Sequence, residues 1–406
     1  MLTIVVLICL GILLLFSIKS PRLFIAWSYF FYFYFYLIVT RLKIIEIGGA
    51  IKPIYILFGI TLLGIVLAKE SARKTSPYIL IVMLYFIYNV FCSFRGLPKY
   101  GQWSIGEGRE YYLSLLFFLY VILKIRDTED FNYIIKSIIL TGLVVSLSAF
   151  YIFTTNLILY SQVVRTFAAG KALAMPIGFF LSAYYLREKL RYKYYIIIQS
   201  LFIISIIICQ HRSVWLGFIG GIVVKFLLEF KRIKQKNVIV SIVFFSIVIG
   251  AFFSTLDNSY MRPISEVFSK RLLFASTRYY DDMAGMARLS AWKAEVHKFY
   301  SYPIWGSGWG NKEITTEIWG DVTKHVHNGH LTMLSRTGII GYFLFLLLFL
   351  GIIKRNDSNQ LISLNISILT MLIFSFFYPI LMPIWILLGL AACYSNLNQF
   401  KKIKSS

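Results

Sequence analysis

Two places in this sequence bring arginine and histidine abruptly against apolar residues. The first is Gln210-His211-Arg212-Ser213, which separates two apolar runs and leaves almost no room for a loop. An arginine at a membrane edge either extends toward the lipid headgroups or faces a polar cavity, where its guanidinium can grip phosphate oxygens in a bidentate manner. The sequence leaves both interpretations of Arg212 open.

The second place is a polar interval of about seventy residues, from Asn258 to Asn328, that holds no apolar run long enough to cross a membrane. Within it, apolar residues recur at helical spacing over 287–299 and predict an amphipathic helix of about three turns. Arg288 then falls in the first turn, where the helix dipole and free backbone N–H groups favour an anion. A surface arginine without a ligand fits the same pattern.

Three histidines, His325, His327 and His330, surround Asn328 at the end of this interval. A histidine held at the entrance of the next apolar run would be suited to act as a general base near neutral pH. The spacing HxHxxH is also typical of metallo-hydrolases, but Gly329 stands where that motif has an aspartate, so we predict no metal site. Loop histidines without a role are the third alternative.

A glycine-rich segment, Pro303 to Gly310, lies between the predicted helix and these histidines. Three glycines in five positions predict a tight turn that another part of the backbone approaches closely. The segment is not a phosphate-binding P-loop, because no Gly-Lys-Ser/Thr follows.

The elements that must position these residues are membrane-spanning helices. The chain is 58% hydrophobic with a mean hydropathy of +0.73, and apolar runs recur along its 406 residues. The first run lacks a basic n-region and a cleavage site, so we expect it to be a retained span. The pattern predicts an all-α polytopic membrane protein with about 12–13 spans, at roughly 2–18, 23–40, 51–68, 78–94, 110–125, 131–154, 172–187, 194–210, 213–230, 237–255, 329–353, 361–378 and 381–397.

Charge divides the chain into three segments. The interval 256–328 carries nine Lys/Arg and eight Asp/Glu, so all but one of the 23 net positive charges lie outside it. Basic residues in short loops are the positive-inside signal of a membrane protein and not a nucleic-acid footprint. We expect about ten spans over 1–255, a large external loop over 256–328, and further spans with a basic cytoplasmic tail over 329–406.

The sequence resembles the bacterial O-antigen ligase/polymerase superfamily over roughly residues 194–350. The order and spacing of several short motifs carry this resemblance. They are Arg212-Ser213 with Trp215-Leu216-Gly217, Arg288 with Trp292, Tyr302-Pro303 with Gly306 and Gly308, His327-Asn328, and Gly338 with Gly341.

The resemblance implies a glycosyltransferase-C-like membrane fold, with the large loop and the active site facing the periplasm from the bacterial inner membrane. It implies glycan transfer from undecaprenyl pyrophosphate without a metal or cofactor. Arg212 and Arg288 would hold the pyrophosphate, and His327 would take the proton of the acceptor hydroxyl. We also place His211, His325, His330 and Asn328 among the substrate-binding residues.

We expect an O-antigen polymerase that moves the growing chain to the non-reducing end of a new lipid-linked repeat unit, with inversion. The alternative is an O-antigen ligase that moves polymer to lipid A core, and a third, of another class, is a lipid-linked-sugar flippase. The expected partners are undecaprenyl-pyrophosphate-linked oligosaccharides as donor and acceptor, membrane lipid, and a polysaccharide chain-length regulator.

Overall fold

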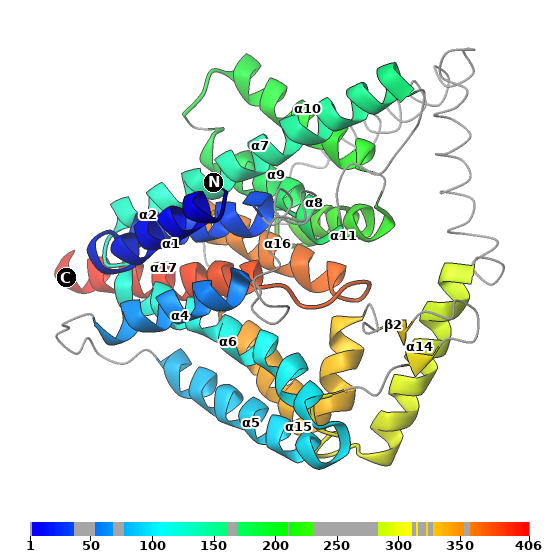
Figure 1. Ribbon diagram of the computed structural model, residues 1–406. Coiled ribbons are helices and arrows are strands. Elements are labelled where there is room, and N and C mark those ends of the chain that lie inside the picture. Colours follow the sequence, from blue (N-terminus) through cyan, green and yellow to red (C-terminus); the bar gives the residue numbers. More distant parts are fainter. Residues whose placement is uncertain are drawn as a thin grey trace.

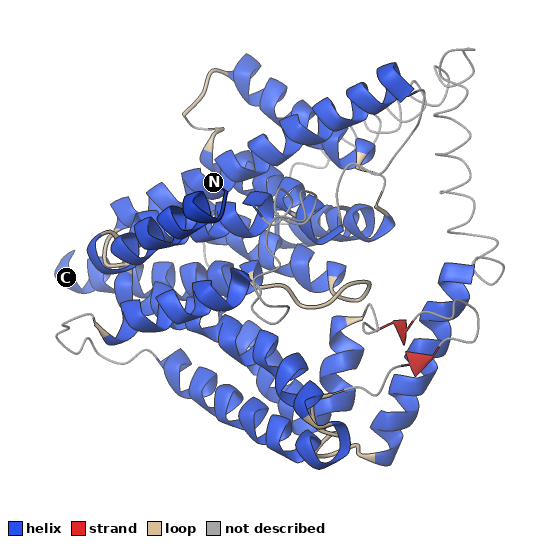
Figure 2. Ribbon diagram, viewed as in Figure 1, coloured by secondary structure: helices blue, strands red, loops and turns tan. Residues whose placement is uncertain are grey.

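The computed structural model describes residues 2–35, 53–67, 77–160, 169–187, 189–209, 211–229, 283–310, 314–315, 322–323, 328–352 and 358–405. Within these residues the fold is helical apart from one antiparallel pair of two-residue strands, β1 (Ile314–Thr315) and β2 (Val322–Thr323) (Figure 2). The helices are α1 (Leu2–Lys19), α2 (Pro21–Phe30), the π-helix η1 (Phe31–Phe35), α4 (Pro53–Val66), α5 (Pro77–Tyr100), α6 (Gln102–Lys124), α7 (Thr128–Tyr160), α8 (Ala169–Ala172), α9 (Ala174–Tyr185), α10 (Tyr192–Ile208), α11 (Arg212–Glu229), α14 (Met283–Ser301), α15 (Gly329–Ile352), α16 (Asn359–Phe374) and α17 (Pro383–Ser405).

These helices confirm the predicted all-α polytopic membrane fold. The described part of each predicted span lies mainly on a helix or on consecutive helices, and 237–255 lies outside the described residues, as do the ends of some other spans, such as 36–40. Among the described helices, three are long and apolar enough to cross a membrane: Tyr78–Tyr100, Thr128–Asn156 and Gly329–Gly351. Shorter apolar helices accompany them at Leu57–Val66, Tyr192–Ile208, Asn359–Phe374 and Pro383–Tyr394.

The helices pack into two connected groups (Figure 1). In one group α7, α9 and α10 pack together, and α9 and α11 both pack along α16. In the other group α5 packs against α6 and α15, and α6 packs against α17. Helix α16 also contacts α17 and so joins the groups, while α14 packs along α15 at the periphery.

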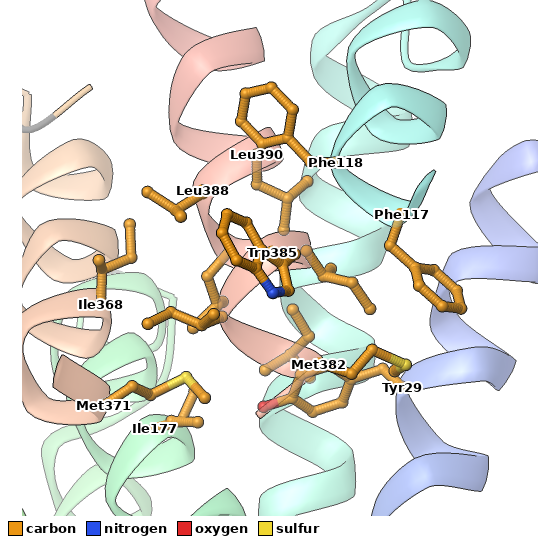
Figure 3. Packing of buried hydrophobic residues seen from close by; sticks show 14 of the residues in the cluster. Tyr29, Phe117, Phe118, Ile177, Ile368, Met371, Met382, Trp385, Leu388 and Leu390 are labelled. Atoms are coloured by element: carbon orange, nitrogen blue, oxygen red, sulfur yellow. The ribbon is translucent and has the colours of Figure 1, made fainter. Parts of the chain in front are cut away.

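The core between these helices is rich in aromatic side chains (Figure 3). Trp385 of α17 is buried at its centre, with its ring 5.9 Å from Tyr85 and 6.2 Å from Phe345. Phe24 and Tyr29 of α2 are also fully buried within the protein. Each large ring contributes a large buried contact area. Inside a membrane the hydrophobic effect does not drive helices together, so this close packing of side chains stabilises their association.

Helix α15 is broken at Gly338, whose φ of 65° and ψ of −170° lie outside the helical region. A break inside a membrane span frees backbone carbonyl and N–H groups, and these must find other partners within the protein. A Cβ atom at this position would lie 2.2 Å from the carbonyl oxygen of Ile304. Glycine is therefore required at Gly338 both by its conformation and by the approach of a second backbone.

The glycine-rich turn Pro303–Gly310 supplies the missing partners. The N–H groups of Ser307 and Gly308 donate to the carbonyls of Ser335 and Arg336, on the first side of the break. In return, the N–H groups of Ile339 and Ile340 donate to the carbonyls of Pro303 and Ile304. The turn thus binds the backbone groups that the break leaves free on both sides of Gly338. The predicted close approach of another part of the backbone to the turn is confirmed.

The same turn is also attached to α5 and α6. Trp309 is fully buried, stacks on Tyr111 at 4.3 Å and donates its indole N–H to the Asn89 side chain. Its backbone N–H donates to the carbonyl of Cys92. Gly306, Gly308 and Gly310 all have positive φ, so the path of this turn depends on them.

We predict that Gly306→Ala strongly destabilises the protein. Its φ is 72° and a Cβ would lie 2.2 Å from the Arg336 carbonyl oxygen, so the turn would have to leave α15. The matched control is Gly106→Ala in α6, where the added Cβ meets nothing within 4 Å and should stabilise the helix slightly. Thermal unfolding in detergent should show a much lower Tm for the first variant alone, and equal Tm values would contradict the role of the turn.

Candidate functional site

The first predicted place forms a tight hairpin between α10 and α11. Helix α10 ends at Ile208 and α11 begins at Arg212. The backbone carbonyl of His211 accepts the N–H groups of Val214 and Trp215, and the Trp215 indole N–H donates back to the Ile206 carbonyl at 2.7 Å. Arg212 therefore occupies the first position of a helix that is held by backbone hydrogen bonds.

The polar interval from Asn258 to Asn328 ends where α15 begins. The side-chain oxygen of Asn328 accepts the N–H of Leu331 at 2.9 Å, and its backbone carbonyl accepts the N–H of Thr332. Asn328 is therefore the N-cap of α15, and this contact gives it a structural role. His325 and His327 lie outside the described residues.

Helix α11 and the start of α15 both contact the C-terminal end of α16 or the residues just after it. Gly329 at the start of α15 donates its N–H to the carbonyls of Ser375 and Tyr378, at 2.7 and 3.1 Å. Gly217 of α11 approaches Phe374, the last residue of α16, so closely that a Cβ would lie 3.2 Å from its side chain. The end of α16 is therefore a common neighbour of α11 and of the start of α15.

His330 lies inside this junction. Its Nε2–H donates to the Leu372 carbonyl at 2.9 Å, so in the neutral tautomer Nδ1 accepts from the Tyr342 hydroxyl at 3.1 Å. The imidazole also stacks on Phe376 at 4.2 Å, and the residue is buried. Both ring nitrogens are occupied within the protein, so these contacts join α15 to α16 and do not present the ring to a substrate.

Helix α14 is longer than the sequence pattern predicted. It begins at Met283, one turn before the expected start at Ala287, so Arg288 lies in its second turn. The expectation that Arg288 sits beside the free N–H groups of a first turn is therefore wrong. The preceding Met-Ala-Gly-Met-Ala segment carries no strong helix stop, and alanine and methionine are good helix formers.

A buried ionic network fastens α14 to the membrane helices. Arg336 of α15 and Glu295 of α14 are both fully buried, and Glu295 accepts from Arg336 Nη1 at 2.6 Å and Nη2 at 3.0 Å. Arg336 Nε also donates to Glu107 of α6 at 3.2 Å, and Lys298 Nζ lies 3.0 Å from Glu295. Two cations and two carboxylates balance, which is what a buried charge cluster requires.

The network shifts the pKa values of Glu295 and Lys298, its two members on α14. Burial alone would raise the pKa of Glu295, but the positive charges of Arg336 and Lys298 and the Ser335 hydroxyl outweigh it and lower the pKa below its usual range. Burial and the neighbouring Arg336 guanidinium lower the pKa of Lys298, against the opposing effect of Glu295. Glu295 is thus held as a carboxylate.

Sequence reasoning did not single out this network, although two signals were present. Arg336 interrupts an apolar run of span length, where an ionisable residue usually has a specific partner. Glu295 shares the helical spacing of the apolar residues Ala291, Trp292 and Phe299, so it lies on the buried face of α14. Nothing in the sequence pairs either residue with Glu107, which is more than 180 positions away.

Residues 197–346 match a family model described as O-Antigen ligase. This region runs from α10 through α11 and α14 to the middle of α15, and it contains Arg212, Arg288, Asn328, Glu295 and Arg336. This match supports the O-antigen ligase/polymerase superfamily for the matched region, and an O-antigen ligase/polymerase-type function in general. Members of that family are glycosyltransferase-like enzymes of lipopolysaccharide biosynthesis. A comparison with curated proteins finds no match.

We predict that Glu295→Gln lowers the stability of this O-antigen ligase/polymerase-type protein by about 3–5 kcal/mol, since removing one partner leaves a buried charge uncompensated. The matched control is Glu129→Gln, which removes a carboxylate 83% exposed and 3.1 Å from Arg22. An exposed pair contributes about 0–1 kcal/mol, so this control should change Tm little. Similar Tm losses in the two variants would show that the buried network contributes no more to stability than the exposed Arg22–Glu129 pair.

Stability should also fall in acid because of Glu295. Its folded pKa is lowered, so its contribution is fully present above its ordinary value of 4.5 and is lost as the pH falls through the lower folded value. The Tm difference between wild type and Glu295→Gln should therefore be constant from pH 7 down to about pH 4.5, and should shrink as the pH falls further toward the lowered folded pKa of Glu295. A Tm difference that does not shrink below about pH 4.5 would contradict this assignment.

Proposed function

We propose that the protein is an O-antigen polymerase of the inner membrane, with its site on the periplasmic side. It transfers the growing chain from undecaprenyl pyrophosphate to the non-reducing end of a new lipid-linked repeat unit. The observation that carries the proposal is that α11, which begins at Arg212, and the start of α15, which Asn328 caps, both contact the C-terminal end of α16 and the residues just after it. The family match over 197–346 supports the same region as the site.

Each proposed role follows from side-chain chemistry. The guanidinium groups of Arg212 and Arg288 stabilise the charge that develops on the pyrophosphate leaving group. His327 removes the proton of the attacking sugar hydroxyl as that oxygen forms its bond to the anomeric carbon. Direct displacement inverts the configuration at this carbon and requires neither a covalent intermediate nor a metal ion.

The remaining predicted contacts divide by position. His211 and His325, which flank Arg212 and His327 in sequence, are proposed contacts to the sugars or phosphates. Asn328 contributes by capping α15 and so fixing where that helix begins. His330 is proposed to act only through packing, because its ring nitrogens are already engaged by Tyr342 and Leu372.

A flippase or transporter typically has broken helices with polar residues at membrane depth. Helix α15 is broken and does carry Arg336, but the freed backbone groups are bound by the glycine-rich turn and the arginine by two carboxylates. The polar groups at the break are therefore bound within the protein and are not available to a transported substrate. For this reason we favour an enzyme.

Ligase activity is the second candidate, because the matching family model is described as O-Antigen ligase. We favour the polymerase because polymerases are the more numerous and varied members of the superfamily. Both activities use an undecaprenyl-pyrophosphate donor and differ in the acceptor. A polysaccharide chain-length regulator is a proposed partner of the polymerase.

Deleting the gene and separating the lipopolysaccharide on a gel distinguishes these activities. Loss of a polymerase leaves core carrying a single repeat unit. Loss of a ligase leaves bare core, with polymer still attached to undecaprenyl pyrophosphate. Loss of a flippase also leaves bare core, but no polymer forms. Only the first pattern agrees with the proposal.

We predict that His327→Ala and Arg288→Ala each abolish chain growth while the protein still accumulates in the membrane. Loss of a general base or a phosphate contact typically lowers the rate by about 10²–10⁴-fold. Two exposed residues of α14, His297 and Lys293, provide matched controls, and His297→Ala and Lys293→Ala should give normal ladders. Normal ladders from the site variants would exclude the proposed mechanism.

A further inference from the structure

An exposed apolar stripe follows the outward face of α5. Its members recur at helical spacing and are Leu80, Met83, Leu84, Ile87, Phe91, Phe94 and Leu97. Helix α5 is one of the described helices able to cross a membrane. A helix of this length rises about 36 Å, somewhat more than the roughly 30 Å of a bilayer hydrocarbon core. The stripe therefore faces lipid, and its last members reach the headgroup region.

The glycine-rich turn extends this lipid-facing surface. Ile304 and Trp305 are 55% and 50% exposed, although the other side of the same turn is buried against α15. The Trp305 ring lies 6.4 Å from the ring of Phe91 on the α5 stripe. Ile339, which is bound to the turn through its N–H, is exposed on the adjacent face of α15. Exposed apolar side chains from three elements are thus continuous.

Basic and aromatic side chains border this surface at the end of α5. Lys99 Nζ lies 3.8 Å from the centre of the Tyr302 ring, and Arg95 Cζ lies 5.8 Å from it. Trp103, at the start of α6, is also exposed. Tyrosine and tryptophan beside lysine and arginine are typical of the level at which a bilayer changes from acyl chains to headgroups.

We propose that Tyr302–Trp305 inserts into the membrane interface, with Ile304 and Trp305 among acyl chains and with Arg95 and Lys99 at the phospholipid phosphates. The expected external loop 256–328 is then not wholly in water, because its glycine-rich turn is a membrane anchor. Continuity with the lipid-facing stripe selects phospholipid as the occupant, since a protein partner would also have to cover the α5 stripe within the bilayer.

A nitroxide attached to Ile304→Cys tests this proposal in full-length protein in phospholipid nanodiscs, with the four native cysteines replaced. Electron paramagnetic resonance then compares collisions with oxygen, which concentrates in lipid, and with a water-soluble nickel chelate. We expect the oxygen-to-nickel collision ratio at residue 304 to be several-fold higher than at Lys293→Cys, an exposed α14 position. Equal, water-like ratios at the two sites would overturn the proposal.

A second measurement avoids replacing cysteines. Brominated phospholipids quench the fluorescence of tryptophans that reach the acyl chains. Wild-type protein should lose more emission in such nanodiscs than Trp305→Phe does, because Trp305 contributes a quenchable share. If wild type and Trp305→Phe lose the same amount of emission in brominated lipid, the Trp305 side chain does not contact the acyl chains. Neither measurement depends on catalytic activity, so each outcome is separate from that of the proposed polymerase function.

Discussion

The break in α15 at Gly338 is the constraint on which the arrangement of α14 and the glycine-rich turn depends. A membrane span cannot leave backbone N–H and C=O groups without partners, because lipid offers none. Here the partners come from the turn 303–310, through four backbone hydrogen bonds that join the two sides of the break to that turn. Each of the two segments needs the other, since an isolated α15 would expose polar groups and an isolated turn would lose its shape.

The consequence is that the end of α14 is attached to the spans at two levels. The turn binds the break itself, and one to two turns earlier along α14 the Glu295 carboxylate binds Arg336, two residues before Gly338. Burying the charges of Arg336 and Glu295 costs desolvation energy, which is offset only where geometry and hydrogen bonds are complete. Arg336 meets this condition by a bidentate contact with Glu295 and a further contact with Glu107. Helix α14 therefore has a defined face and register against α15.

At its N-terminal end, α15 is held by α16 and by the residues that follow α16. The Gly329 N–H, the Asn328 cap and the imidazole of His330 together fix where α15 begins. The α10–α11 hairpin approaches the same end of α16 through glycines that permit close packing. An enzyme of O-antigen ligase/polymerase type needs such fixed elements, because the rate of transfer depends on holding both reactants in a defined geometry.

The sequence by itself determined the helices, because a span requires a long apolar run and a loop requires its interruption. Apolar runs predicted the positions of the described spans, three glycines in five residues predicted a tight turn, and short motifs indicated the superfamily that the family model confirms. Only the tertiary structure decided which charges meet: Glu107, Glu295 and Arg336 come from three distant elements, and no local pattern links them. It also showed that His330 is satisfied inside the protein and that Arg288 lies a turn from the helix start. Local spacing governs backbone conformation, whereas the partner of a buried polar group is set by packing between helices far apart in the chain.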